Sequence, residues 1–263
     1  MTANTAGNLA VTWWGHASVT LEIGGVRVAT DPLLSRQLMH LRRASPVPPS
    51  AASLADVVLV SHLHHDHLHL PSIRKFDVDV PLVVPKGAAK AVRGLRGRRL
   101  VEVAPGETHD VGDLRIEVLP ARHDGRRDPL ARTAAPALAF RLTSSGRRCW
   151  YSGDTGVDEA VEAVDPVDLA IVAIGGWGPT LGDDHLSPEQ AAGVVGRIGA
   201  TWSLAVHYGT FWPVTMKRAH PRNYRRLFEN PPAQFIRAIE EQGVATEPLI
   251  PAFGERLELC PGP

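Results

Sequence analysis

A histidine-rich turn at residues 61–70, SHLHHDHLHL, is the feature that most constrains how this chain can fold. It places five histidines and Asp66 directly after VVLV, an apolar run of the kind that forms a buried strand. Because so many polar side chains cannot be buried without partners, we expect the chain to leave the sheet at residue 61. Loops at the carboxyl ends of strands carry the sites of α/β sheets, so this turn is a candidate functional site.

Three other predicted strands also end in residues that can bind metals. His123 follows VLPAR, Asp154 follows CWYSG, and His207 follows WSLAV. Neutral imidazoles and carboxylates are the nitrogen and oxygen ligands that zinc accepts in proteins. The pattern favours one metal site built from several strand ends over a solvated turn whose histidines share no partner.

The order of the predicted elements indicates mixed sheets covered by helices. Gly24 and Gly25 separate two strand-like runs and predict a two-residue hairpin, so the chain opens with an antiparallel pair. Further along, strands alternate with helices that we predict at 157–164, 187–199 and 232–243. Such a sequence is typical of sheets that carry helices on their outer faces.

Residues 36–50, RQLMHLRRASPVPPS, end in prolines that block regular strand pairing, and they predict a surface loop. Two interpretations remain open for this segment. It is either a lid over the site, which would bring His40 towards a substrate, or an ordinary connection.

Length and composition favour one compact domain over residues 1–263. The 28 basic and 28 acidic residues cancel, which argues against nucleic acid as a partner. The sequence shows neither a secretory signal pattern nor an apolar run of about 18 residues, so we expect no membrane span and a cytoplasmic location. The oligomeric state stays open, a homo-oligomer included.

The turn also resembles a known family signature. Residues 62–67, HLHHDH, are similar to the H-x-H-x-D-H motif of the metallo-β-lactamase superfamily. The segments TWWGHASVTLEIGGVRVATDPLLS, SGDTG, DHLSPEQA and VHYGTF resemble the branch that contains N-acyl-phosphatidylethanolamine phospholipase D and the ascorbate-phosphate lactonase. The resemblance implies an αββα sandwich, in which two mixed β-sheets are flanked by helices.

The resemblance further implies a hydrolase with two divalent metal ions, Zn²⁺ in the first instance, with Mn²⁺ or Fe²⁺ as alternatives. Two such ions can share a hydroxide that attacks the substrate. The implied ligands are His62, His64 and His123 for one ion, Asp66, His67 and His207 for the other, and Asp154 as the bridge. Asp66 would also orient the hydroxide. His185 would either protonate the leaving group or have a purely structural role in its turn.

Ligand residues alone do not choose the substrate, because related enzymes cleave different bonds with nearly the same ligands. We expect a phosphodiesterase acting on a small molecule, with a lactonase or another ester hydrolase as the alternative. A different class of function also stays open, a metal-binding or interaction protein without catalysis.

Several residues near the motif have two interpretations each. His16 and Asp31 either orient metal ligands through hydrogen bonds or belong to ordinary turns. Arg126 and Arg127 either recognise a phosphate or lie in a solvated loop. His65 is either a substrate contact or a surface residue. Trp177 either walls a pocket or belongs to the core.

Overall fold

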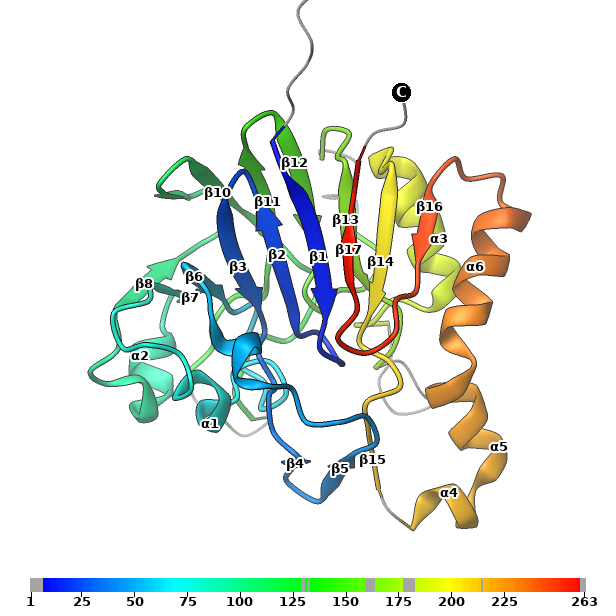
Figure 1. Ribbon diagram of the computed structural model, residues 1–263. Coiled ribbons are helices and arrows are strands. Elements are labelled where there is room, and N and C mark those ends of the chain that lie inside the picture. The colour runs from blue at the N-terminus through cyan, green and yellow to red at the C-terminus, as the bar shows by residue number, and fades with distance from the viewer. Residues whose placement is uncertain are drawn as a thin grey trace, which may run out of the picture.

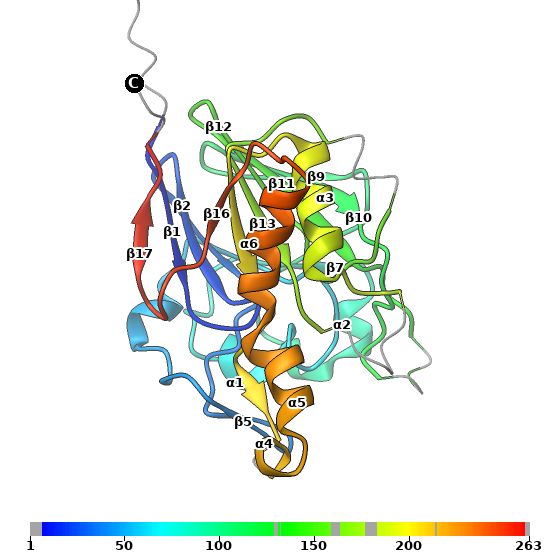
Figure 2. The same ribbon diagram turned by 90° about the vertical axis from the view of Figure 1, so that its right-hand side faces the viewer.

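The computed structural model describes residues 7–128, 131, 133–158, 164–176, 183–213 and 215–260. Two seven-stranded β-sheets face each other, and helices lie on their outer faces (Figures 1 and 2). One apolar core holds side chains from both sheets, which shows that their inner faces pack together. This architecture confirms the predicted αββα sandwich.

The first sheet combines an antiparallel half with a parallel half. Its strands, in spatial order, are β17 (Arg256–Glu258), β1 (Leu9–Trp13), β2 (Val19–Ile23), β3 (Val26–Thr30), β6 (Val57–Leu59), β7 (Leu82–Pro85) and β8 (Leu100–Val103). Gly24 and Gly25 form the predicted two-residue hairpin between β2 and β3, with positive φ angles of 57° and 86°. Glycine adopts these angles without steric cost, so the turn is set by the sequence.

The second sheet carries its parallel half at the other edge. Its strands, in spatial order, are β16 (Glu247–Leu249), β14 (Trp202–Val206), β13 (Leu169–Ala173), β12 (Arg147–Tyr151), β11 (Leu138–Ser144), β10 (Leu114–Pro120) and β9 (Thr108–Val111). Pairing places the last residues of β10 and β12 at the same edge of this sheet as the first residues of β11. Loops that follow β10, β12 and β14 therefore leave the sheet on one side.

Helices cover the outer faces of both sheets. Two long helices, α3 (Pro188–Ile198) and α6 (Pro231–Glu241), lie side by side over the second sheet (Figure 2). Ser187 caps α3, since its hydroxyl accepts a hydrogen bond from the Gln190 amide. The short elements are α1 (Leu70–Ile73), α2 (Ala88–Ala91), α4 (Met216–Ala219), α5 (Pro221–Tyr224), the 3₁₀ turns Ser50–Ser53 and Arg93–Leu95, and the π-turn Arg225–Glu229. The helix predicted at 157–164 falls largely outside the described residues.

Strand β6 explains why the histidine turn begins where it does. Val57 and Leu59 pack between the two sheets, whereas Val58 and Val60 pack on the opposite face, in a second core with α1 and α2. Because successive side chains point to opposite faces, a strand buried on both sides has a continuous apolar sequence. The polar residues from 61 onward cannot continue that pattern, so the chain turns away at the sheet edge.

The prediction of a surface loop at 36–50 is wrong for the first half of this segment. Strands β4 (Gln37–Leu38) and β5 (Leu41–Arg43) form a hairpin, and β5 pairs with β15 (Phe211–Trp212) to make a third, three-stranded sheet. The buried guanidinium of Arg43 donates hydrogen bonds to the carbonyls of Trp14, Leu33 and Ser35. These bonds tie the hairpin to the body of the protein, so it forms a fixed wall.

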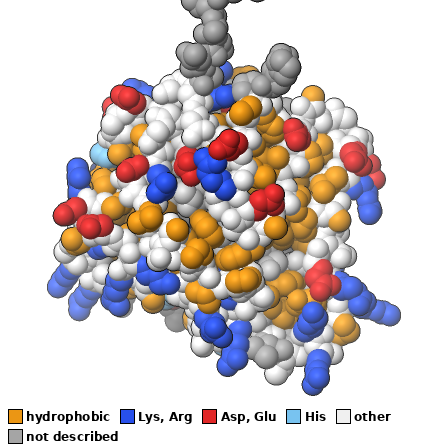
Figure 3. Space-filling model, in the orientation of Figure 1, with side chains coloured by type: hydrophobic (Ala, Val, Ile, Leu, Met, Phe, Trp, Pro, Cys, Tyr) orange, Lys and Arg blue, Asp and Glu red, His pale blue; other side chains and the backbone are white. Residues whose placement is uncertain are grey.

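The surface agrees with the balanced charge of the chain. Figure 3 shows acidic and basic side chains interspersed on one face of the molecule. Within the described residues, every helix is too short or too polar to cross a lipid bilayer.

Candidate metal centre

All seven predicted metal ligands come together at one edge of the sandwich. His62, His64, Asp66 and His67 lie on the turn after β6, and Asp154 and His207 follow β12 and β14. His123 follows β10 from the same side of the second sheet. The site is thus assembled by the topology, from segments up to about 145 positions apart in the sequence.

His62, His64 and His123 form the first cluster. The Nδ1 atom of His64 lies 2.9 Å from His62 Nε2 and 3.2 Å from His123 Nε2. His123 Nδ1 lies 3.0 Å from the Asp184 carbonyl oxygen. A proton on Nδ1 can be donated to this oxygen, which leaves the Nε2 lone pair free for a metal. Burial lowers the pKa of all three histidines, which keeps the imidazoles in the neutral form that binds metals.

Asp66, His67 and His207 form the second cluster, and His16 joins it. His67 Nε2 lies 3.2 Å from His207 Nε2, and each of these atoms lies 3.6 Å from Asp66 Oδ2. His16 Nε2 is 3.0 Å from the same Asp66 oxygen. The expected hydrogen bond between His16 and a predicted metal ligand is thus present. The His16 ring also lies close enough to be a candidate metal ligand itself.

Asp154 lies between the two clusters. Its Oδ2 atom is 3.1 Å from His67 Nε2, 3.2 Å from His207 Nε2 and 3.3 Å from His185 Nε2. It also belongs to a possible donor group with His123 and His185. The carboxylate is 2% exposed, and its Oδ1 atom has no hydrogen-bond partner among the described residues. A buried oxygen of this kind is costly unless a cation or a donor satisfies it.

The donor set fits divalent cations. Imidazole nitrogens that lie about 3 Å apart cannot all be protonated, so their lone pairs point at common positions. Nitrogen and carboxylate oxygen donors together suit zinc, and also manganese or iron. We conclude from this chemistry that the residues present can hold such ions.

Asp31 holds His67 in a defined orientation. Its Oδ2 atom accepts hydrogen bonds from His67 Nδ1 at 2.6 Å, from the Tyr151 hydroxyl at 2.5 Å and from the Ser61 hydroxyl at 2.5 Å. The Ser61 amide donates to Oδ1 at 2.7 Å. With its proton on Nδ1, His67 presents the Nε2 lone pair to the site. The sequence indicated Asp31. Ser61 and Tyr151 were missed, although Ser61 adjoins His62 and Tyr151 lies three residues before Asp154.

Both arginines form contacts within the protein, and their phosphate-binding interpretation stays a prediction. The Arg127 guanidinium donates hydrogen bonds to the carbonyls of Leu63 and Leu68 at 2.7 and 2.6 Å, so it braces the histidine turn from behind. Arg126 pairs with Asp124 at 2.7 Å. His65 accepts a hydrogen bond from Arg127 and contacts Asp128, on the exposed side of the turn.

His185 does reach the site, as the sequence suggested. Its side chain is 10% exposed, and its ring lies 4.8 Å from that of His123. Gly176 makes room for it: a Cβ atom there would lie 2.6 Å from the His185 ring and 2.8 Å from the His207 ring. The neighbouring Trp177 lies outside the described residues.

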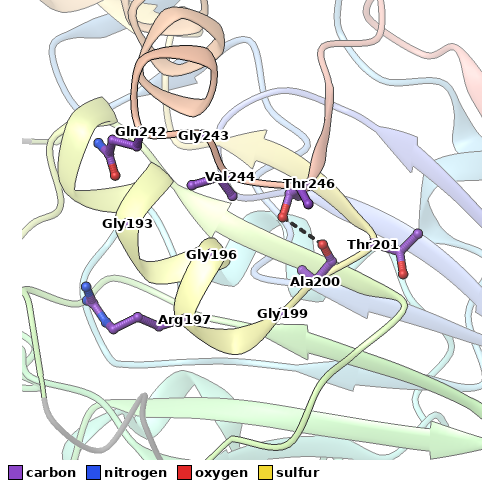
Figure 4. A pocket seen from close by; sticks show the side chains of 11 residues that line it. Gly193, Gly196, Arg197, Gly199, Ala200, Thr201, Gln242, Gly243, Val244 and Thr246 are labelled. Carbon is purple, nitrogen blue, oxygen red and sulfur yellow. Dashed lines mark hydrogen bonds between the residues drawn. The ribbon is translucent and has the colours of Figure 1, made fainter.

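A separate cavity is not part of this site. It measures about 610 Å³ and lies between α3 and the segment from Gln242 to Thr246 (Figure 4). Its lining includes Ala200 and Thr201, which precede β14, whereas His207 follows β14. A five-residue strand of about 17 Å separates the two locations.

Metal binding should release protons, and this can be measured. Burial alone would lower the pKa of His207, but Asp154 raises it to about 9. In the metal-free protein His207 therefore holds a proton that stabilises the fold below pH 6.5, and this contribution is lost as the pH rises through about 9. We expect zinc affinity to increase over that range, with at least about one proton released per chain. Calorimetry of zinc binding in two buffers of different ionisation enthalpy measures the number of protons released. Equal heats of binding in the two buffers would contradict the prediction.

Comparison with known proteins identifies similar sequences. The family description "Beta-lactamase superfamily domain" matches residues 26–208, more than half of the chain. An uncharacterised protein of Mycobacterium tuberculosis is 31% identical over 224 residues, which make up 78% of this chain and 60% of that protein. An N-acyl-phosphatidylethanolamine-hydrolyzing phospholipase D of Caenorhabditis elegans is 28% identical, over 77% of this chain and 64% of the relative. This chain thus matches less than two thirds of the length of either relative.

Other similar proteins have lengths close to that of this chain. A protein of Methanopyrus kandleri, named as a metal-dependent hydrolase, is 28% identical over 95% of this chain and all of its own length. Among solved structures, a metallo hydrolase of Ignicoccus hospitalis has a TM-score of 0.69 at 19% identity and covers 95% of this chain and 98% of its own. An isothiocyanate hydrolase from Delia radicum gut bacteria has a TM-score of 0.69 at 20% identity, covering 94% and 98%. These two structures share the fold.

Proposed function

The chain belongs to the β-lactamase superfamily, and from this premise we propose that it is a hydrolase that uses two divalent metal ions. The observation that supports this most strongly is Asp154, a buried carboxylate set between two clusters of imidazole donors. When bound, such ions lower the pKa of water and stabilise charge that develops on the substrate. The relative of full matching length is named as a metal-dependent hydrolase, which agrees with this proposal.

We further propose that the bond cleaved is a phosphodiester. Two relatives, at 28% and 29% identity, are named as N-acyl-phosphatidylethanolamine-hydrolyzing phospholipases D. Arg126 and Arg127 are occupied by other partners, so the metal centre itself would bind the phosphoryl oxygens. A lactone or another ester is the alternative substrate class.

Asp66 and His185 would act beside the ions. Asp66 Oδ2 is held by His16 at 3.0 Å, which orients its carboxylate towards His67 and His207. There it can accept a proton from the attacking water. His185 Nε2 lies 3.3 Å from Asp154 Oδ2, where a proton on Nε2 can pass to the leaving group.

Hydrolysis assays on metal-stripped and metal-reloaded protein test the proposal. We expect bis(p-nitrophenyl) phosphate to be cleaved faster than p-nitrophenyl acetate or dihydrocoumarin, and only after Zn²⁺, Mn²⁺ or Fe²⁺ is restored. Asp66→Ala should reduce kcat by roughly 10²–10⁴-fold, the usual contribution of a general acid or base. Asp113→Ala, in the exposed turn between β9 and β10, is the control. Metal uptake without turnover of any ester would instead identify a metal-binding protein, and preferred cleavage of the lactone would replace the phosphodiester.

A further inference from the structure

An apolar pocket of about 310 Å³ opens directly onto the candidate metal centre. The two share His16, Asp66 and His207. A substrate group bound in the pocket would therefore lie beside the metal ligands. The bond that joins this group to the rest of the substrate could then lie at the metal centre.

Apart from Gly176, the remainder of the pocket is formed by three segments of the chain. They are the β4–β5 hairpin, strand β15 with its flanking residues, and the turn after α5. The apolar side chains that they contribute include Leu38, Leu41, Phe211, Trp212, Leu227 and Phe228. Lysine and arginine are absent from the described residues that line it, and Asp66 is the carboxylate at its inner end. A charged group in the part of the pocket away from the metal centre would lose hydration without gaining a counter-ion.

The walls of this pocket are held in place by packing. The Trp212 ring lies edge-to-face against Tyr224 at 5.2 Å and against Phe228 at 5.7 Å. The Arg43 guanidinium lies 4.8 Å from the centre of the Phe211 ring, while its nitrogens are bonded to backbone carbonyls. A preformed pocket binds its ligand with less ordering cost than one that must be assembled.

We infer that this pocket binds a compact, uncharged apolar group of the substrate, one or two rings in size, next to the bond that is cleaved. The inference rests on the proposed hydrolase, whose substrate class it narrows. A cavity of roughly 150 Å³ holds one benzene ring, so a volume of about 310 Å³ suits one or two rings. An extended acyl chain would protrude from it, and its outer part would gain little from the pocket.

Binding of simple phosphate monoesters to the metal-loaded protein tests the inference without requiring turnover. In this series the phosphate is constant and the organic group varies: methyl, phenyl, 2-naphthyl, octyl and 4-carboxyphenyl. We expect calorimetry to show phenyl and naphthyl phosphate binding about 10- to 100-fold more tightly than methyl phosphate, as burial of an aromatic group allows. The carboxyl group should remove that gain, and octyl phosphate should bind no more tightly than naphthyl phosphate.

Variants of the wall separate the pocket from the metal centre. Leu41→Trp fills the pocket and Trp212→Ala removes one wall, so each should reduce the phenyl-to-methyl affinity ratio to near 1. Val78→Ala, at an exposed apolar residue outside the pocket, is the matched control and should retain the ratio. One variant adds side-chain volume and the other removes it. If one of them fails to fold, the other still tests the pocket.

The possible results separate this inference from the proposed function. Equal affinities for the methyl, phenyl and naphthyl esters would contradict the inferred binding of an apolar group in the pocket, even if the protein hydrolyses phosphodiesters. If the octyl ester bound most tightly, the pocket would bind an extended alkyl chain, and the inference of a compact group would be wrong. Aromatic preference that Leu41→Trp abolishes, in a protein that cleaves no ester, would support the pocket and contradict the hydrolase.

Discussion

Replacing Asp154 with alanine should remove at least one bound metal ion and most of the hydrolytic activity. The wild-type chain should bind about two divalent ions, and the variant one or fewer, because the carboxylate lies between both donor clusters. Losing a hydrogen bond to a metal ligand typically costs 10–100-fold in affinity or activity, and Asp154 is itself a proposed ligand. We therefore expect kcat/KM to fall by about 10³-fold or more.

The physical reason is the arrangement of charge around Asp154. Burial alone would raise the pKa of this carboxyl, but His207 and His67 lower it well below its usual range, so it stays ionised. Without it, His67 Nε2 and His207 Nε2 lose the anion that lies 3.1 and 3.2 Å away. Two cations would then face the imidazoles with one carboxylate fewer to offset their charge.

Metal analysis by mass spectrometry and steady-state kinetics measure these effects. Asp128→Asn is the matched control, since this carboxylate contacts the exposed His65 and should leave metal content and kcat/KM near wild-type values. A variant Asp154→Ala that keeps two metals and full activity would remove the main support for the proposed centre. Circular dichroism of the metal-free forms shows whether the variant still folds.

The candidate metal centre was accessible to sequence analysis because each predicted ligand stands close to the end of a predictable strand. The run VVLV predicts a strand buried on both faces, and the polar residues after it must therefore lie at the sheet edge. The same logic placed Asp154 and His207 after β12 and β14. The Gly24–Gly25 hairpin was predictable for a similar reason, because its geometry depends on two adjacent residues.

Features that depend on distant pairing were not accessible in this way. Residues 37–43 form a hairpin whose strand β5 also pairs with β15, about 170 positions later, and this distant partner leaves no local signal in the segment itself. The apolar pocket has the same origin, since its walls come from three separate segments. Arg127 shows the related difficulty for side chains: its guanidinium suits a phosphate, but the fold brings the carbonyls of Leu63 and Leu68 within 2.7 Å of it.

Asp31 shows how far the stability of the fold and the metal centre depend on one another. This fully buried carboxylate accepts hydrogen bonds from the Ser61 amide and hydroxyl, from Tyr151 and from His67. Removing one partner of a buried charged pair usually costs about 3–5 kcal/mol, because the remaining groups lose their partner in a place that water does not reach. Tyr151→Phe removes one donor and leaves the carboxylate with three others, so a smaller loss of about 1–3 kcal/mol is expected.

Asp31→Ala should therefore lower the free energy of unfolding of the metal-free protein by about 3–5 kcal/mol, and should weaken zinc binding by roughly 10–100-fold because His67 is no longer held. Urea denaturation without metal and zinc titration of the folded protein measure the two effects separately. Asp56→Ala serves as the control, because this exposed carboxylate accepts a hydrogen bond from the Arg27 amide far from the site, and its loss should change stability by about 0.5 kcal/mol at most. If Asp31→Ala bound zinc as tightly as the wild type, His67 would either be held by other contacts or not bind the metal, and the orienting role of Asp31 would be wrong.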